Sequence, residues 1–579
     1  MVGVKERLSS IMDIIKGRGA AQAALLLSLV AVLLAPTLRA DFLWDDFAQI
    51  VDSPTIGDPS WIPFYFTHNV VQSAGGEGRG ADGVDTYRPL FMVSLAAVYA
   101  INGADPFWFH LAVLVAHLLV CVVLWLLAIR WLDSPVAASV AVLFFACHPV
   151  TAEAYLWSSA LPEPLAAAGL LAAVLILDRR CGEASPGSRT WVAPTVAGVV
   201  FIAGLMSKEV VLLALPAMSV FLVIVRRIRM RYLAPMWTAV AVFLVMRSFA
   251  LGGLQATGAD PAQRLEALRI WPVVILDGLR AMITMTPVGI RHLSWEYASL
   301  GWGRSLAATA VCITLFAAAL LLRRAAPLVV TAGLTTGLML APIALVATVP
   351  GWGGFGRYLY FPLAVTSLAL AQLAMVIQQW FAERQPTFRW AVPVVVVTAL
   401  IVEQVGLRHA LWVYANQENL ARAAIEIFPE GPDGWEWLGN VYLDREDLPA
   451  ALECYREATQ RGPQLYRPRH NYAAALLFTG QPAEALAQIA ILDELHSPTP
   501  DRAVLEVTAL MNLERWDEAA RTLVESLDRA PDYVSLAEVA ARLVREHPRT
   551  DELNDWFSEV LVQPEHHNAA GVIRPLLEG

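Results

Sequence analysis

Long apolar runs, each ending at charged residues, proline or glycine, dominate the first 408 residues of the chain. A helix needs roughly 20 mostly apolar residues to cross the hydrocarbon of a bilayer. With 57% hydrophobic and 16% charged residues, the 579-residue chain also has the composition of a membrane protein. We predict an all-α fold with eleven spans, at residues 20–36, 107–129, 135–150, 161–178, 192–206, 208–225, 233–250, 304–322, 326–347, 358–379 and 390–408.

Two shorter apolar stretches, 90–101 and 270–288, are predicted to be helices at the membrane interface. The second carries Asp277 and Arg280. The basic N-terminal segment before the first run resembles a signal peptide, but a retained first membrane helix is favoured because many more spans follow.

The arginines and lysines of the connections fall on alternate loops. Short loops rich in Arg and Lys stay on the cytoplasmic side of a membrane. This rule places the following residues in the cytoplasm: the basic residues of segment 1–19, Arg130, Arg179, Arg180, Arg226, Arg227, Arg229, Arg231, Arg323, Arg324, Arg384 and Arg389.

The opposite connections hold the unusual polar clusters of the membrane half. They are Thr37 to Arg88, His148 to Pro164, Lys208 with Glu209, 251–303, and Gly351 to Arg357. An odd number of spans also places the C-terminal tail on this outer side. We therefore expect one site to collect these clusters.

Residues 409–579 are acidic, with 29 Asp and Glu against 14 Arg and no Lys. Phosphate backbones need a basic surface, so the net charge of −10 gives no reason to expect nucleic acid as a partner. The five cysteines show no CxxC or metal-type spacing and are predicted to be packing residues: Cys121, Cys147, Cys181, Cys312 and Cys454.

The tail carries the signature of a 34-residue helix-turn-helix repeat. Small residues recur 34 positions apart, at Ala451, Ala485 and Ala519, where paired helices approach closely. We predict about three tetratricopeptide (TPR) units with capping helices from Ser535, and a groove that binds a protein or peptide, with a spacer or dimerisation surface as the alternative. The first unit is marked by Trp435, Leu438, Gly439, Tyr442, Ala451, Tyr455, Ala458 and Pro463.

Two adjacent carboxylates, Asp45 and Asp46, lie among aromatics just after the first span. A carboxylate held near aromatic bulk keeps a raised pKa suited to accepting a proton, whereas a solvated loop or a helix cap is the plainer interpretation. Tyr87 and Arg88 follow a Gly-rich stretch, Gly75 to Gly83, and introduce the first interfacial helix. There an arginine either snorkels to headgroups or binds a lipid phosphate.

Lys208 is one of three lysines in the chain and lies with Glu209 between two apolar runs. Ionisable residues are costly there, which favours a functional role over a self-satisfied Lys-Glu pair. His148, Glu153 and Glu163 share a loop and are the candidates for a divalent metal, although a structural His beside Pro is more common.

A last candidate lies at the end of the Gly-rich segment that starts at Gly351. Arg357 and Tyr358 stand there at a membrane boundary. They fit a phosphate clamp and, nearly as well, an interfacial aromatic anchor.

In their order along the chain these motifs resemble the transmembrane and TPR (TMTC-like) O-mannosyltransferases of the GT-C glycosyltransferase superfamily. The resemblance is carried by Trp44-Asp45-Asp46 with Ile50, Asp52-Ser53-Pro54, Tyr87-Arg88-Pro89-Leu90, His110, His117, His148-Pro149-Val150 with Glu153, Lys208-Glu209, Arg357-Tyr358-Leu359-Tyr360 and the repeats. The composition looks bacterial, which implies an undecaprenyl-type donor, an inner-membrane location and a periplasmic site.

The resemblance implies a GT-C-like bundle that moves a sugar, a hexose such as mannose, from a polyprenyl phosphate to a hydroxyl acceptor, Ser or Thr of exported proteins. It implies that Asp45 or Asp46 is the base. Donor phosphate would be held by Arg88, Lys208 and Arg357, and the acceptor side would be supported by Tyr87, His148, Glu153, Glu209 and Tyr358. No cofactor beyond the lipid-linked sugar is firmly implied, and a metal stays open.

We predict a cytoplasmic segment 1–19, a transmembrane domain 20–408 with the catalytic outer loop 37–106, a linker with a first helix at 409–434, and a TPR domain 435–579. The Gly-rich insertion and the small number of repeats depart from the family pattern, which leaves the acceptor open. The alternatives are a GT-C transferase acting on a lipid or envelope glycan, and a non-catalytic TPR membrane scaffold.

Overall fold

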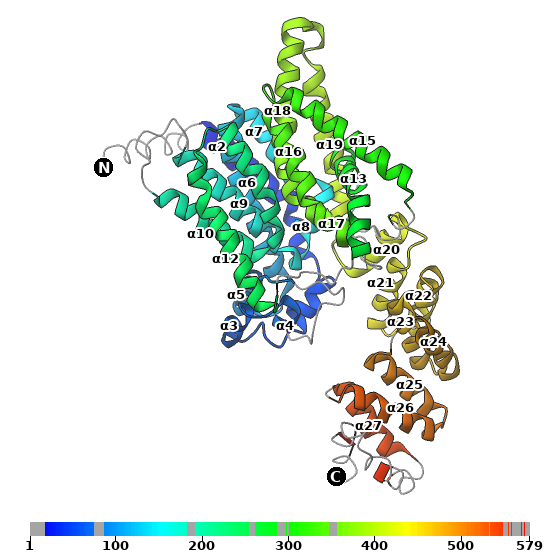
Figure 1. The fold of residues 1–579 in the computed structure, drawn as a ribbon. Coiled ribbons are helices and arrows are strands. Elements are labelled where there is room, and N and C mark those ends of the chain that lie inside the picture. Colours follow the sequence, from blue (N-terminus) through cyan, green and yellow to red (C-terminus); the bar gives the residue numbers. More distant parts are fainter. Residues whose placement is uncertain are drawn as a thin grey trace. The chain divides into compact units, whose positions relative to one another are not determined.

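Helices are the only regular elements in the part of the chain that the computed structural model describes (Figure 1). It describes residues 18–74, 86–181, 191–253, 261–285, 300–346, 356–496, 498–531 and 533–547, with residue 297 and a few single positions after 553. Most of the segment 1–19, the Gly-rich stretch 75–83, the start of the loop 351–357 and most of the predicted C-terminal cap lie outside the described residues. The chain divides into two compact units, Met1–Asn419 and Leu420–Gly579.

The first unit is a bundle of long apolar helices (Figure 1). Within the described residues, eight of them are long and apolar enough to cross a membrane, and all eight correspond to predicted spans. The length and apolar composition of these helices identify the chain as a multi-pass membrane protein. The helices of these eight segments are α2 (Arg18–Leu34), α6 (Pro106–Leu132), α9 (Pro162–Arg180), α12 (Ala234–Ala250), α15 (Trp302–Leu322), α16 (Pro327–Met339) with α17 (Ala341–Val346), α18 (Tyr360–Arg384) and α19 (Ala391–Val413).

The other three predicted spans are also helical but shorter. They are α7 (Pro135–Ala146), α10 (Val192–Ser207), and a 3-10 turn, Glu209–Ala214, continued by α11 (Leu215–Ile224). Of the two predicted interfacial helices, α5 (Pro89–Asn102) has the expected bounds. The helix α13 (Pro261–Thr284) starts before the predicted stretch. A search for apolar residues missed its first turns because they are charged and carry the ion pair of Arg269 with Glu266.

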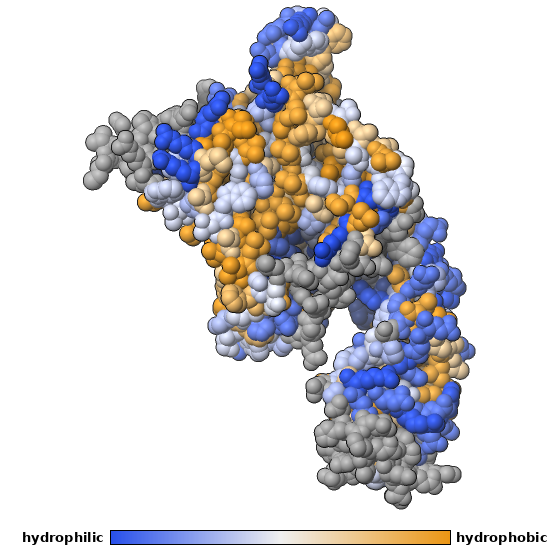
Figure 2. All heavy atoms as spheres, viewed as in Figure 1, coloured by the Kyte–Doolittle hydropathy of each residue, from blue (hydrophilic) through white to orange (hydrophobic). Residues whose placement is uncertain are grey.

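Large apolar side chains cover much of the outer surface of the bundle (Figure 2). On α19, for example, Val394, Val395 and Val405 are each more than 60% exposed. Exposed apolar patches of this extent are rare on soluble monomers. They are the surface that a lipid-embedded bundle needs.

Ion pairs show which connections share an end of the bundle. Arg130 at the end of α6 and Arg226 after α11 both bind Asp178 near the end of α9, at 2.7 and 2.6 Å. We call this the arginine end. At the other end of α9, Ser159 contacts the loop that follows α2. We call this the site end, and the segment after α19 also lies there, because the backbone N–H of Asp41 donates to the carbonyl of Ala415 at 2.9 Å.

The second unit repeats a helical hairpin (Figure 1). The first helices of successive hairpins start at residues 433, 466, 500 and 534, and the second helices at 448, 482 and 516, which agrees with the predicted 34-residue period. The bounds of its helices are α20 (Gln417–Ile427), α21 (Asp433–Asp444), α22 (Leu448–Arg461), α23 (Tyr466–Phe478), α24 (Pro482–Leu495), α25 (Pro500–Asn512), α26 (Trp516–Arg529) and α27 (Val534–Glu546). The first unit also contains three short helices, α3 (Ile62–Tyr65), α4 (Val70–Ser73) and α8 (Glu153–Leu156).

The motif residues of the first repeat are explained by helix packing. A Cβ added at Gly439 would lie 2.7 Å from the ring of Tyr455, so only glycine permits this approach of α21 to α22. Ala451 is fully buried in the same contact. The guanidinium of Arg461 lies over Trp435, 4.8 Å from the centre of the Trp435 ring. The hydroxyl of Tyr442 accepts a hydrogen bond from Arg422.

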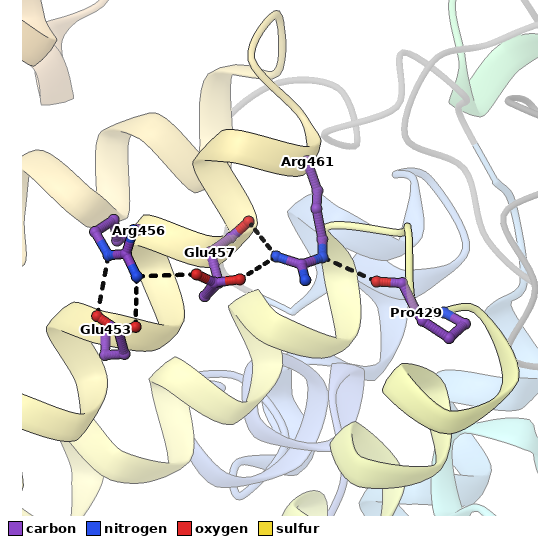
Figure 3. A network of polar contacts seen from close by, with 5 residues as sticks. All are labelled: Pro429, Glu453, Arg456, Glu457 and Arg461. Atoms are coloured by element: carbon purple, nitrogen blue, oxygen red, sulfur yellow. Dashed lines mark hydrogen bonds and ion pairs between the residues drawn. The ribbon is translucent and has the colours of Figure 1, made fainter.

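Two arginines of this repeat bind glutamates of the same helix (Figure 3). Arg456 binds Glu453 and Glu457 on α22, and Arg461 binds Glu457 and donates to the carbonyl of Pro429 at 2.8 Å. Pairs of this kind stabilise a helix by only about 0.2–0.5 kcal/mol each. The hydrogen bond from Arg461 to Pro429 ties the end of α22 to the segment after α20.

The turn inside each hairpin uses a left-handed residue at the same repeat position. Glu446, Gly480 and Glu514, again 34 residues apart, have φ of 59°, 75° and 59°. A Cβ at Gly480 would contact nothing within 4 Å, so Gly480→Ala adds only the conformational cost of a left-handed residue. We expect it to destabilise the unit by about 1 kcal/mol.

Hydrogen exchange of the α23 and α24 amides in the full chain measures the loss of stability in Gly480→Ala. The control is Glu514→Ala, which keeps a side chain at the equivalent turn and is expected to change exchange little. Unchanged protection in Gly480→Ala would contradict the explanation.

Candidate functional site

The loop after α2 holds Asp46 as a buried carboxylate. Trp44 adopts a left-handed backbone, with φ of 43°, which is strained for a bulky residue and turns the chain sharply before the two aspartates. Asp46 is 0% exposed and accepts hydrogen bonds from the backbone N–H groups of Leu43, at 2.9 Å, and Ser159, at 2.7 Å. The hydroxyl of Ser159 donates to the same carboxylate. Asp46 therefore fastens the loop to the start of α9.

Asp45, its neighbour, is exposed. It lies close enough to Arg357 and to Asp46 to interact electrostatically with both. Trp157 fixes the surroundings: its indole N–H donates to the carbonyl of Leu43 at 3.1 Å, and Arg357 lies over its ring at 5.0 Å. The structure thus gives the two aspartates different environments, one inside the protein and one facing solvent.

Two ion pairs join segments that are far apart in the sequence. Arg88 binds Glu209 through two parallel hydrogen bonds, from Nε at 3.0 Å and Nη2 at 3.1 Å. The residue before Glu209 in the chain, Lys208, is 2% exposed and pairs with Glu163 at the start of α9. Lys208 also lies 4.4 Å from the centre of the Tyr358 ring. Such pairs are costly to bury, so they have to be held in good geometry.

Arg357 connects the remaining carboxylates. Its backbone N–H donates to Glu153 at 3.2 Å, and its Nε lies 3.3 Å from Glu153 and 3.9 Å from Glu163. Burial raises the pKa of the Glu153 carboxyl, and Arg357 opposes that rise. The structure therefore gathers the three predicted phosphate-binding cations into one cluster. We call it the cation cluster: Arg88, Lys208 and Arg357 with Glu153, Glu163 and Glu209.

A small cavity lies within the cation cluster, lined by Glu163, Lys208, Arg357, Tyr358 and Tyr360 among others. It has room for roughly one water molecule. This cavity by itself is therefore too small for a sugar phosphate.

The structure places Tyr87 and His148, predicted for the acceptor side, in contacts with the backbone and with aromatic rings. The hydroxyl of Tyr87 donates to the carbonyl of Phe66 at 2.9 Å, and its ring packs 5.9 Å from that of Phe243. Both ring nitrogens of His148 are used by the backbone, Nε2 against the Met282 carbonyl at 2.9 Å and Nδ1 against the Val150 N–H at 3.2 Å.

His148, Glu153 and Glu163, the candidates for a divalent metal, do not converge on one point in the structure. Glu153 and Glu163 face Arg357, while His148 is held by the backbone. Among the residues described, no three His, Cys, Asp or Glu side chains lie close enough to hold a metal ion.

Several residues of the site were not predicted. Trp157 and Ser159 lack any local signal, because their roles depend on contacts with a loop about a hundred residues earlier. Tyr360 lines the cavity and is held by His117, whose Nδ1 lies 2.7 Å from its hydroxyl. Since the Nε2 of His117 faces the carbonyl of Ala146 at 3.1 Å and must carry the proton, Tyr360 donates to Nδ1.

Asp46 makes the stability of this loop depend on pH. Burial raises the pKa of its carboxyl from 3.8 to about 7, although hydrogen bonds from Ser159 and Leu43 lower it. Between these values the folded chain keeps a proton that the unfolded chain has released, so the contribution of Asp46 to stability falls as the pH rises.

We expect Asp46→Asn to abolish this part of the pH dependence, because an amide does not titrate. Only one of the two polar atoms of the amide accepts hydrogen bonds, so the N–H of Leu43 or that of Ser159 loses its partner. This loss destabilises the fold by about 1–3 kcal/mol. Melting temperatures of both proteins across the acid to neutral range test this. Parallel curves for variant and wild type would contradict it.

Comparison with known proteins gives a distant relationship. No known family profile matches the chain. The chain is 30% identical over 189 residues to a mouse (Mus musculus) protein, Protein O-mannosyl-transferase TMTC1. The similar region makes up 32% of this chain and 19% of the mouse protein. The chain is therefore a multi-pass membrane protein by its apolar helices, and it is distantly similar to a protein O-mannosyl-transferase.

Proposed function

We propose that the protein is an integral-membrane glycosyltransferase of GT-C type, which moves a sugar from a polyprenyl-phosphate donor to a hydroxyl acceptor. The expected sugar is a hexose such as mannose, and the expected acceptor is Ser or Thr of exported proteins. The similarity to an O-mannosyl-transferase supports the reaction class. The choice of donor and acceptor belongs to the proposal.

The observation that carries the proposal is the position of the exposed Asp45 beside the cation cluster. A transferase of this kind needs a carboxylate that reaches an acceptor hydroxyl and cations that meet a phosphate. Asp45 faces solvent and interacts with Arg357, whose guanidinium belongs to the cluster. A solvent-facing carboxylate and a group of cations therefore lie close together at one end of a membrane bundle.

In the proposed step, the acceptor oxygen forms a bond to the anomeric carbon of the sugar. The bond between that carbon and the phosphate oxygen breaks, and the phosphate leaves with the electron pair as polyprenyl phosphate. The hydroxyl proton passes to the Asp45 carboxylate. Arg88, Lys208 and Arg357 stabilise the negative charge that grows on the phosphate, because preorganised cations act most strongly where charge develops.

Asp46 has a positioning role in this proposal. Its buried carboxylate is saturated by donors from Leu43 and Ser159, so it is poorly placed to receive a proton from a substrate. It holds the strained turn at Trp44, which presents Asp45. The glutamates of the cluster hold the three cations in position and balance their charge. When the donor binds, its phosphate replaces the glutamates as the partner of the cations.

We further propose that the site end faces the periplasm of a bacterial inner membrane. The arginine end then faces the cytoplasm, in accordance with the preference of basic loops. The chain leaves the bundle at the site end, which would place the repeat unit in the same compartment as the site.

We propose that the repeat unit binds a protein or peptide, the acceptor or a partner of the enzyme. Between its first two hairpins, Arg467 and Asn471 on α23 meet the buried carboxylate of Glu436 on α21. Side chains of this kind bind the polar groups of an extended peptide.

Mass spectrometry of envelope proteins and glycans from cells with and without the chain tests the proposed function. We expect a hexose to disappear from Ser or Thr of a set of exported peptides when the chain is removed. A change confined to lipid-linked or envelope glycans would replace the protein acceptor with a glycan acceptor. No change in any glycoconjugate would favour the scaffold alternative and contradict the proposal.

A further inference from the structure

An apolar groove of about 390 Å³ runs between α10 and α12 on the surface of the bundle. Small residues such as Ala234 and Ala239 line it, and Gly198 lets α10 approach the backbone of Pro235 on α12 at its floor. Val199 and Thr238 line it and are exposed. Its volume is in the range of grooves that hold small ligands, and its lining suits a hydrocarbon chain.

The groove lies in the half of the bundle that is nearer to the arginine end. Its lining comes from residues 191–202 and 234–242, which are the first turns of α10 and α12. Both helices begin on the side of the bundle where the arginine run 226–231 connects α11 to α12. The groove is therefore separated along the helices from the cation cluster, which begins where α10 ends at Lys208.

Aromatic and basic residues surround the mouth of the groove. Trp191, which lines it, packs its ring 6.0 Å from that of Tyr232. Arg231 lies over the Tyr232 ring at 4.9 Å and donates to its hydroxyl at 3.0 Å. Arg227 and Arg229 are exposed on the same short connection. Trp and Tyr prefer the membrane interface, and arginines there attract anionic headgroups.

We propose that this groove is a binding site for an anionic phospholipid. One acyl chain lies along α10 and α12, and the headgroup phosphate meets Arg231 with Arg227 and Arg229 nearby. Charge complementarity selects the occupant, because a neutral or zwitterionic lipid gains the apolar contacts of the groove without the attraction of the arginines. The site is independent of the proposed sugar transfer, since it uses none of the residues of the cation cluster.

The test uses the full chain reconstituted in vesicles of phosphatidylcholine with a minor fraction of phosphatidylglycerol. After mild detergent extraction, lipid mass spectrometry counts the phosphatidylglycerol that stays with the protein. We expect enrichment over the vesicle composition, and a loss of roughly fivefold for each arginine removed in Arg229→Ala and Arg231→Ala. Val199→Trp fills the groove without changing charge and is expected to lower retention as well.

The matched control is Arg323→Ala with Arg324→Ala. These arginines follow α15, which packs against α13 and α16, and their removal changes the net charge by the same amount. Retention in this control is expected to equal that of the wild type. Phosphatidylglycerol retained only in proportion to the vesicle composition, or lowered equally by the control, would overturn the proposal.

Discussion

Asp45→Asn is expected to lower the rate of sugar transfer by about 10²- to 10⁴-fold, the range associated with loss of a general base. The exchange removes the carboxylate that receives the proton and changes the size of the side chain little. Asp45 is exposed, whereas the loop is held by Asp46 and Trp157, so the fold is expected to survive. The measurement is the initial rate of transfer by purified variant and wild type, with the melting temperature of each.

Asp52→Asn is the matched control. It makes the same chemical change at another exposed acid of the same loop, and we expect the rate to stay near that of the wild type. A wild-type rate in Asp45→Asn would rule out Asp45 as the base. Loss of activity in both variants would point to the overall charge of the loop instead.

The second large effect concerns the buried pair of Lys208 and Glu163. Removing one partner leaves the other charge buried without its direct ion pair, so Lys208→Met and Glu163→Gln are each expected to destabilise the protein by about 3–5 kcal/mol. The double variant removes both charges and is expected to recover much of this loss. Equilibrium unfolding of the four proteins in one detergent measures the coupling between the two residues.

An exposed pair provides the comparison. Arg515 and Glu518 on the repeat unit are each 47% exposed, and Glu518→Gln is expected to cost less than about 1 kcal/mol. If the buried substitutions cost no more than this one, or if their effects simply add, the pair is not the buried ionic contact that the structure shows.

The helices of the membrane half were largely predictable, because a bilayer imposes a length and a composition on each crossing. The boundary errors have physical causes. The start of α13 was missed since its first turns are charged, as Glu266 and Arg269 show. The repeat unit was predictable from spacing alone, because close helix approach requires residues such as Gly439 and Ala451.

The candidate site was predictable only in part. The charge of the loops indicated that Arg88, Lys208 and Arg357 share an end of the bundle, but not which carboxylate each one meets. Likewise, no local pattern distinguishes Asp45 from Asp46. Their difference depends on Ser159, which lies 113 residues further along the chain and donates to Asp46.

Donor consumption by the reconstituted full chain tests the central claim most directly. Vesicles contain a polyprenyl-phosphate hexose, and a soluble peptide rich in Ser and Thr is the acceptor. The account predicts that wild-type protein converts the donor to polyprenyl phosphate and adds one hexose mass to the peptide, while Asp45→Asn does neither. A donor that stays intact with folded wild-type protein, whichever hydroxyl acceptor is supplied, would contradict the account.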